Sequence, residues 1–122
     1  MATLRDAVYG LAVGDALGVP FEFMERGTFE CGGMVGFGTH AKPAGTWSDD
    51  TSLTLATCDS IREQGAVEPG DIRRRFRAWL DLGAYAIGRD VFDVGGTTAG
   101  AIRSGVGCSG ERDCGNGSLM RI

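Results

Sequence analysis

One stretch of the sequence decides the fold, Ser48-Asp49-Asp50-Thr51-Ser52-Leu53. A serine followed by two acidic residues is typical of a helix N-terminus, because the hydroxyl can cap free backbone amides and the carboxylates suit the positive end of the helix dipole. We predict a helix from Asp49 to about Gln64, ended by Gly65. Its first half is apolar on nearly all sides, which predicts a central position in the fold. The expected inner face comprises Leu53, Ala56, Thr57, Ser60 and Ile61.

An earlier helix is predicted from Leu4 to about Gly18, with Thr3 as its cap and Asp6 completing a short capping box. Asp15 falls on the apolar stripe of this helix, where an unpaired carboxylate would be unfavourable. We therefore expect Asp15 to be a structural carboxylate, or one that supports a metal ligand, rather than a direct ligand.

Two further helices are predicted downstream. The first follows Pro69-Gly70, with Asp71 as its cap, and has the clearest amphipathic pattern in the chain. Its apolar face comprises Ile72, Phe76, Trp79 and Leu80. The arginines at positions 73, 74, 75 and 77 are most simply its solvated face. The second is a short helix, capped by Thr97 or Thr98, that runs through Ile102.

The segments between these helices are predicted to be loops, because their apolar residues show no regular period. Residues 19–46 and 105–117 are expected to be long loops, and residues 83–94 a loop or a broken helix. Residues 118–122 look like the opening turn of another helix. No strand-like alternation occurs anywhere, so the predicted class is all-α, a helical bundle with long glycine-rich loops.

Composition narrows the functional classes. The 122 residues fit one small domain, and the net charge of −4 argues against a general nucleic-acid binder. No apolar run reaches membrane-spanning length and no secretory signal is visible, so we predict a cytoplasmic protein without a membrane segment. The four cysteines lack zinc-ligand spacing and are expected to be free thiols, although a Cys108–Cys114 disulfide is sterically conceivable. Twenty-one glycines predict sharp loops whose amides can approach a ligand.

The acidic helix start is also the first candidate for chemistry. Successive helical residues point about 100° apart, so Asp49 and Asp50 can address two metal ions from one turn, with the Ser48 hydroxyl as a further ligand. Such oxygen ligands suit Mg²⁺ or Mn²⁺. Taken alone, the stretch is better explained as a structural helix cap.

Three further segments can contribute to a site. Glu22 follows the helix breaker Pro20, where it can reach a site or act as a general base on water. The glycines in residues 93–98 and 115–118 precede helices and can present amides to an anion, or can simply form turns. His40, the single histidine, has no candidate partners that would raise it above a loop histidine.

Read together and in order, these pieces resemble the ADP-ribosylglycohydrolase family. Four segments carry the resemblance: Gly10-Leu11-Ala12-Val13-Gly14-Asp15-Ala16-Leu17-Gly18-Val19-Pro20-Phe21-Glu22, Trp47-Ser48-Asp49-Asp50-Thr51-Ser52-Leu53, Asp93-Val94-Gly95-Gly96-Thr97-Thr98 and Gly115-Asn116-Gly117-Ser118-Leu119-Met120-Arg121. They cover essentially the whole chain but only the first part of the family's domain. Residues 1–122 are therefore expected to be the N-terminal portion of one such domain.

The resemblance implies an all-helical fold and a centre of two divalent metal ions, Mg²⁺ or Mn²⁺, that holds the ribose hydroxyls. Ser48, Asp49 and Asp50 stand where the family has a Thr-Asp-Asp metal-binding trio. Glu22 matches a glutamate implicated in activating water or in gating the substrate, and Asp93 matches an aspartate in the environment of the same water. The residues that match the loop contacting ADP-ribose are Gly115, Asn116, Gly117 and Ser118, with Met120 beside them.

One element of the family pattern has no counterpart here. Members carry a second Asp-x-Asp-Thr segment that completes both metal shells, and none follows Asp50. One serine, two aspartates and Glu22 cannot hold two octahedral ions without many waters. We therefore expect a fragment, half of a split gene or a degraded gene product, with a complementary C-terminal half as a candidate partner.

The leading hypothesis from the sequence is a metal-dependent hydrolase that releases ADP-ribose from a modified protein side chain or a related ADP-ribosyl compound. The alternative is a catalytically incomplete relative that binds ADP-ribose or is purely structural. A two-metal phosphohydrolase fits less well, because such sites generally draw on several histidines. Neither reading predicts a nucleic-acid or membrane partner.

Overall fold

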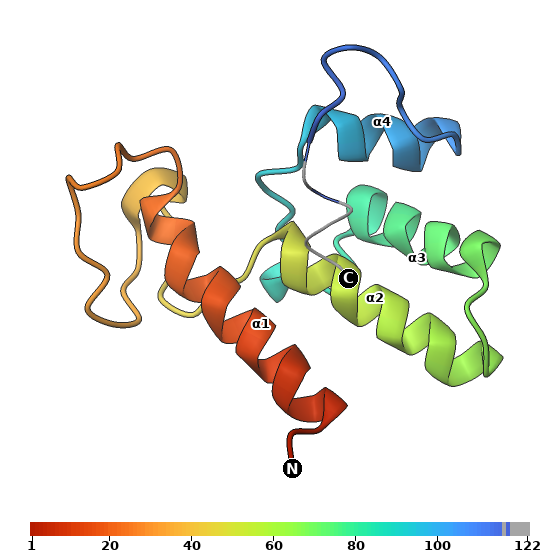
Figure 1. Cartoon of the computed structure of the whole chain (residues 1–122), viewed down its shortest axis with the longest axis horizontal. Helices are drawn as coiled ribbons and strands as arrows, with labels where there is room; N and C mark the ends of the chain where they lie inside the picture. Colours follow the sequence, from red (N-terminus) through yellow and green to blue (C-terminus); the bar gives the residue numbers. More distant parts are fainter. Residues whose placement is uncertain (116, 118–122) are drawn as a thin grey trace.

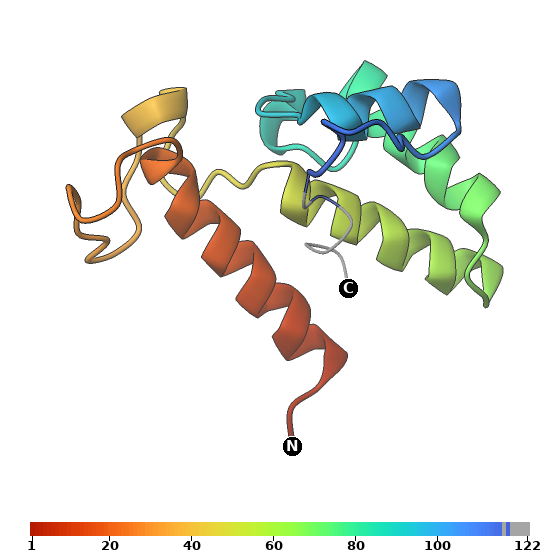
Figure 2. The same ribbon diagram turned by 45° about the horizontal axis from the view of Figure 1, so that its top comes forward.

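The helices surround one central helix. In the computed structural model, residues 1–115 and 117 are described, and they contain α1 (Leu4–Gly18), α2 (Asp49–Gln64), α3 (Pro69–Leu82) and α4 (Gly96–Ser104). As Figure 1 shows, α2 lies between α1 and α3, and α4 packs on α3. The turned view shows the N-terminal end of α1 directed away from the other helices (Figure 2). The predicted all-α class is confirmed, and the central position of α2 agrees with its apolar first half.

Short 3₁₀ turns interrupt the long loops. They are Val19–Phe21, Gly38–His40 and Ile87–Arg89. The first turn follows α1 directly. The second turn lies within the loop of residues 22–46, which folds back so that the two turns contact each other. Within the described residues no strand forms, and the nearest approach to one is an isolated bridge between Phe37 and Lys42. No helix among them is long and apolar enough to cross a membrane.

The core lies between α2, α3 and α4. Leu53, Trp79 and Ile102, one from each helix, are almost fully buried and pack together. The loop between α3 and α4 closes over them. The partly buried residues around this centre are Phe76, Leu80, Tyr85, Ala86, Val91 and Val94. The amphipathic pattern of α3 therefore identified the side that faces the core, whereas Ile61 of α2 lies at an exposed edge.

The starts of α1 and α2 agree with the predictions, and at α1 Thr3 and Asp6 form the expected capping box. α3 begins at Pro69, because proline suits the first helical turn, and Asp71 lies inside that turn instead of capping it. α4 begins at Gly96 with Gly95 at the cap position, ahead of the predicted Thr97 or Thr98, and it continues to Ser104. For α3 and α4, short polar side chains thus indicated the approximate start of the helix but not the residue at the cap position.

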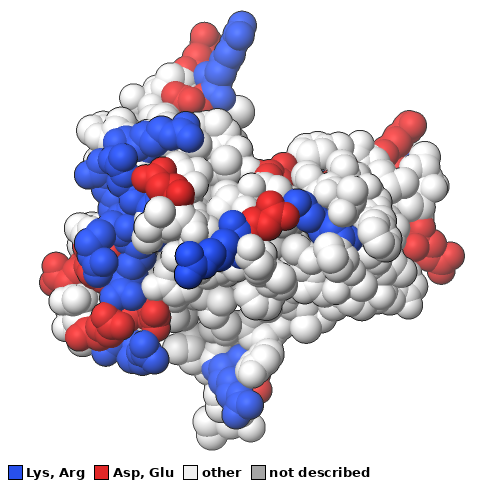
Figure 3. All heavy atoms as spheres, turned by 180° about the vertical axis from the view of Figure 1, so that it is seen from behind, with Lys and Arg blue, Asp and Glu red and all other residues white. Residues whose placement is uncertain are grey.

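The arginines of α3 are only in part a solvated face. Arg75 is buried, and its guanidinium donates to Asp71, Glu63 and the hydroxyl of Tyr85, which ties α2, α3 and the following loop together. Arg74 remains exposed beside a carboxylate. The view from behind shows basic side chains gathered along one edge of the molecule, with acidic side chains beside and among them (Figure 3).

Candidate functional site

The site begins at a junction between two helices. The Asp15 carboxylate of α1 accepts from the backbone N–H groups of Ser48 and Thr51, at 3.0 Å each to Oδ2. It also accepts from both hydroxyls, at 2.7 Å from Ser48 and 2.6 Å from Thr51. Asp15 is therefore the residue that caps α2, whereas Ser48 was predicted to do so and makes no side-chain cap bond. The expected structural role of Asp15 agrees with this geometry.

Capping by Asp15 places the acidic helix start against a cavity of about 500 Å³. Its described lining includes Glu22, Asp49, Asp50 and Asp93. The other lining residues are Phe23, Gly95, Gly96, Thr97, Thr98, Arg112, Gly115 and Gly117. The structure thus brings together residues from all four segments that the sequence singled out, although they are spread over most of the chain.

Three predicted site residues lie outside the described part of the chain, namely Asn116, Ser118 and Met120. Ser48 is buried at 4% exposure and is not among the residues that line the cavity. Its hydroxyl donates to Asp15, which orients the oxygen and leaves lone pairs on it.

A histidine that sequence reasoning dismissed lies beside the two candidate catalytic carboxylates. His40 Nε2 is 2.5 Å from Glu22 Oε2 and 3.7 Å from Asp93 Oδ2. These three ligand atoms lie within 4.8 Å of one another, close enough to surround one metal ion. Because His40 is 18 positions from Glu22 and is the only histidine, no local pattern could have identified this contact.

Crowding of carboxylates changes their acidity. Burial, with Asp93 beside it and the charges of Asp15 and Asp49 nearby, raises the pKa of Glu22 to about 8. Burial, followed by the charges of Asp50 and Asp93, raises the pKa of Asp49 to about 6. Perturbed carboxylates gathered in a cavity are typical of a functional site. Asp93 itself has a left-handed backbone, with φ of 54°, a conformation that aspartate tolerates better than most residues.

The donor set fits a hard divalent cation. Four carboxylates face the cavity, and Arg112 is the single basic residue in its described lining. Burial and the neighbouring carboxylates raise the pKa values of Glu22 and Asp49. A bound Mg²⁺ or Mn²⁺ would neutralise the negative charge of these oxygen donors. Asp49 and Asp50 both line the cavity from the first turn of α2.

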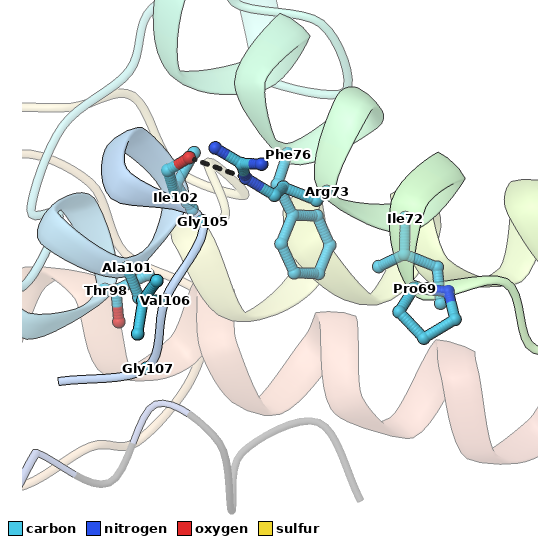
Figure 4. A pocket seen from close by; sticks show the side chains of 10 residues that line it. All are labelled: Pro69, Ile72, Arg73, Phe76, Thr98, Ala101, Ile102, Gly105, Val106 and Gly107. Atoms are coloured by element: carbon cyan, nitrogen blue, oxygen red, sulfur yellow. Dashed lines mark hydrogen bonds between the residues drawn. The ribbon is translucent and has the colours of Figure 1, made fainter. Parts of the chain in front are cut away.

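Two other cavities lack these groups. One of about 300 Å³ lies between α3 and α4, where Arg73 donates to the carbonyl of Ile102 and Phe76 forms part of the wall (Figure 4). Another of about 490 Å³ lies between α1 and α2 and is lined mainly by apolar side chains. Neither of these cavities has a carboxylate in its described lining. The acidic cavity is therefore the candidate site because of the chemical groups that line it, not because of its volume.

Comparison with known proteins agrees with this geometry. The sequence profile described as ADP-ribosylglycohydrolase matches residues 2–122. An ADP-ribosylarginine hydrolase of Pseudomonas putida (strain GB-1) is 34% identical over 97% of this chain and 34% of its own length. An ADP-ribosyl-(dinitrogen reductase) glycohydrolase of Rhodospirillum rubrum is 35% identical over 94% of this chain and 40% of its own length.

The match therefore covers nearly all of this chain but only 34% and 40% of the length of these two relatives. It includes every segment that contributes to the acidic cavity. The chain belongs to the ADP-ribosylglycohydrolase family.

Proposed function

We propose that this protein hydrolyses the bond that joins ADP-ribose to a modified protein side chain, with two divalent metal ions, Mg²⁺ or Mn²⁺, as cofactors. Arginine is the side chain to test first, because the Pseudomonas putida relative is named for ADP-ribosylarginine. One observation carries the proposal: Glu22, Asp49, Asp50 and Asp93 line one cavity together with Gly115 and Gly117.

The two parts of the cavity lining suit the two parts of such a substrate. Carboxylates suit ribose hydroxyls and metal ions, which need oxygen partners. The N-terminus of α4 and the backbone of Gly115 and Gly117 suit a diphosphate, because backbone N–H groups bind anions. Arg112 adds a positive charge to the cavity wall. The substrate would therefore lie with its ribose bond near the carboxylates.

Each acidic residue has a distinct task in the proposed reaction. Ser48, Asp49 and Asp50 would hold the metal ions, which when bound orient the ribose and polarise the attacking water. Glu22 and Asp93 would share and move the proton of that water, since their carboxylates interact directly. The surrounding negative charge would stabilise an oxocarbenium-like transition state, as in other glycoside hydrolyses.

The test is release of ADP-ribose from ADP-ribosylated arginine by the purified protein with Mg²⁺ or Mn²⁺. We expect Glu22→Gln to lower kcat by about 10²- to 10⁴-fold with KM little changed, because the substitution removes the proton acceptor and preserves shape. The matched control is Glu25→Gln, an exposed glutamate three residues away, which should retain full activity. Absence of ADP-ribose release from arginine-, serine- and ester-linked substrates would refute the enzymatic proposal.

A non-catalytic role in binding ADP-ribose is the other outcome of the same experiment. Calorimetry distinguishes the two. Binding of ADP-ribose that needs no metal ion, together with no turnover, would favour the binding role. Binding that requires Mg²⁺ or Mn²⁺ and is weakened by Asp50→Asn would favour the hydrolase.

A further inference from the structure

Three consecutive residues, Gly38-Thr39-His40, pack against the segment that carries Glu22. The α-carbon of Gly38 lies against Pro20, and a Cβ at this position would come within 2.1 Å of the Pro20 carbonyl oxygen. The Thr39 hydroxyl donates to the Glu22 carbonyl at 2.6 Å. His40 then reaches the Glu22 side chain, with Nε2 2.5 Å from Oε2. Both the backbone and the side chain of Glu22 are thus held by one 3₁₀ turn.

The His40 ring is itself held in place by aromatic residues. Its centroid lies 5.1 Å from that of Phe92 and 6.0 Å from that of Phe23. The histidine side chain is only 14% exposed, less than either carboxylate that it faces. A ring packed on two sides has little freedom to turn, so its Nε2 defines a fixed point for its partners.

The same loop also reaches the second candidate catalytic carboxylate. His40 Nε2 is 3.7 Å from Asp93 Oδ2. Two residues later, Lys42 lies over the Phe92 ring, 4.8 Å from its centroid, and forms an ion pair with Asp90. Residues 38–42 therefore connect the segment that carries Glu22 to the segment that carries Asp93.

His40 does not itself line the cavity, whereas Glu22 and Asp93 do. The imidazole therefore reaches the cavity through its contacts with those carboxylates. Glu22 needs such support, because it follows the end of the helical segment in extended backbone (φ −55°, ψ 143°) and no helix constrains its side chain. An unsupported glutamate side chain loses much of its rotamer freedom when it is fixed in one position.

We propose that His40 is a positioning residue, which holds the Glu22 carboxylate in its reactive orientation beside Asp93 by hydrogen bonding to Oε2 from behind the cavity wall. The inference rests on the proposed function for its catalytic consequence. The contact with Glu22 can be tested without any activity.

The first measurement is the ¹⁵N spectrum of the imidazole in the metal-free protein. Because His40 is the only histidine, its ring signals need no assignment. We expect Glu22→Gln to shift the Nε2 resonance strongly, since its hydrogen-bond partner changes from a carboxyl to an amide. Glu25→Gln, which alters an exposed glutamate, should leave the spectrum unchanged. An Nε2 resonance that does not respond to Glu22→Gln would overturn the proposal, whatever the activity.

The second measurement compares kcat and KM for ADP-ribosylarginine hydrolysis. His40→Ala should lower kcat by about 10- to 100-fold with KM nearly unchanged, as expected for a misplaced reacting group. His40→Gln should recover much of the lost kcat, because its amide can hydrogen-bond to Oε2. In a Glu22→Gln background, His40→Ala should cause little further loss, since the group that it positions is already gone.

The outcomes separate the two proposals. Equal loss in the alanine and glutamine variants, or full additivity with Glu22→Gln, would overturn the positioning role even in an active enzyme. If the wild-type protein releases no ADP-ribose while the Nε2 resonance still responds to Glu22→Gln, the proposed function fails and the positioning of Glu22 stands.

Discussion

Replacing Asp15 with alanine should destabilise the protein more than any surface acidic residue would. The carboxylate accepts hydrogen bonds from two backbone N–H groups and two hydroxyls of Ser48 and Thr51. Both donor residues are buried, at 4% and 1% exposure. Alanine would leave the two amides without a partner, and water has little access to replace the lost acceptor.

The magnitude follows from the donors that lose their partner. A buried donor left unsatisfied costs about 1–3 kcal/mol. The two hydroxyls can rotate toward other acceptors, so the two amides dominate. Their sum, with the lost interaction between the carboxylate and the helix N-terminus, gives a loss of about 2–7 kcal/mol in the free energy of unfolding. Asp15→Asn should fall between this value and the wild type, because one amide oxygen remains as an acceptor.

Urea denaturation followed by circular dichroism measures this loss. The matched control is Asp81→Ala, which removes an exposed carboxylate from α3 and should change stability by no more than about 0.5 kcal/mol. Adding Thr51→Val to Asp15→Ala tests the contact itself. The two substitutions should be non-additive by about 0.5–3 kcal/mol, as is usual for partners in one hydrogen-bond network.

A loss for Asp15→Ala no greater than that for Asp81→Ala would refute the reasoning. It would mean that α2 is capped adequately without α1. The order of metal affinities offers a second check, because Asp49 and Asp50 start the helix that Asp15 caps. Asp15→Ala should weaken Mn²⁺ binding, whereas Asp81→Ala should not.

Two further predictions concern backbone strain and pH. Gly65 and Gly83 both end helices at φ of 70°, but only at Gly83 would a Cβ meet backbone, 2.3 Å from the Arg89 carbonyl oxygen. Alanine at Gly65 should cost about 1–2 kcal/mol, and alanine at Gly83 a further ~1–3 kcal/mol. Equal losses in urea denaturation would contradict the steric argument. The raised pKa values of Glu22, about 8, and Asp49, about 6, mean that the folded state keeps protons that the unfolded state releases. Without metal ions, this contribution to stability is present at pH 4 and is lost as pH rises toward 8. Mg²⁺ or Mn²⁺ should therefore raise the midpoint of thermal unfolding more at pH 8 than at pH 5, relative to EDTA. A larger effect at pH 5 would be inconsistent with these shifts.

The helices could be predicted because their determinants are local. Apolar spacing located the face of α3 that carries Trp79, and the capping box at Thr3 involves residues only three apart. The starts of α3 and α4 could not be predicted in the same way. Asp71 was expected to cap α3, but it pairs with Arg75 and Arg74, and pairing with charged side chains competes with capping.

The candidate site, like the helices, could be predicted from the sequence only in part. Family order in the sequence identified Glu22, Asp49, Asp50 and Asp93, and the structure places all of them at one cavity. No role could be predicted for His40, because its partners come from segments far away along the chain. The loop that carries His40 has no periodic pattern, and its course depends on a close approach of Gly38 to Pro20.

The sequence by itself determined the helical class, the positions of the four helices and the acidic residues at the start of α2. Those properties follow from interactions between residues within a turn or two of each other. Only the tertiary structure decided that Asp15, rather than Ser48, caps α2 and that His40 holds Glu22. Both contacts join residues that are distant in sequence, so they exist only after the chain has packed, and packing is what brings a buried carboxylate to its donors.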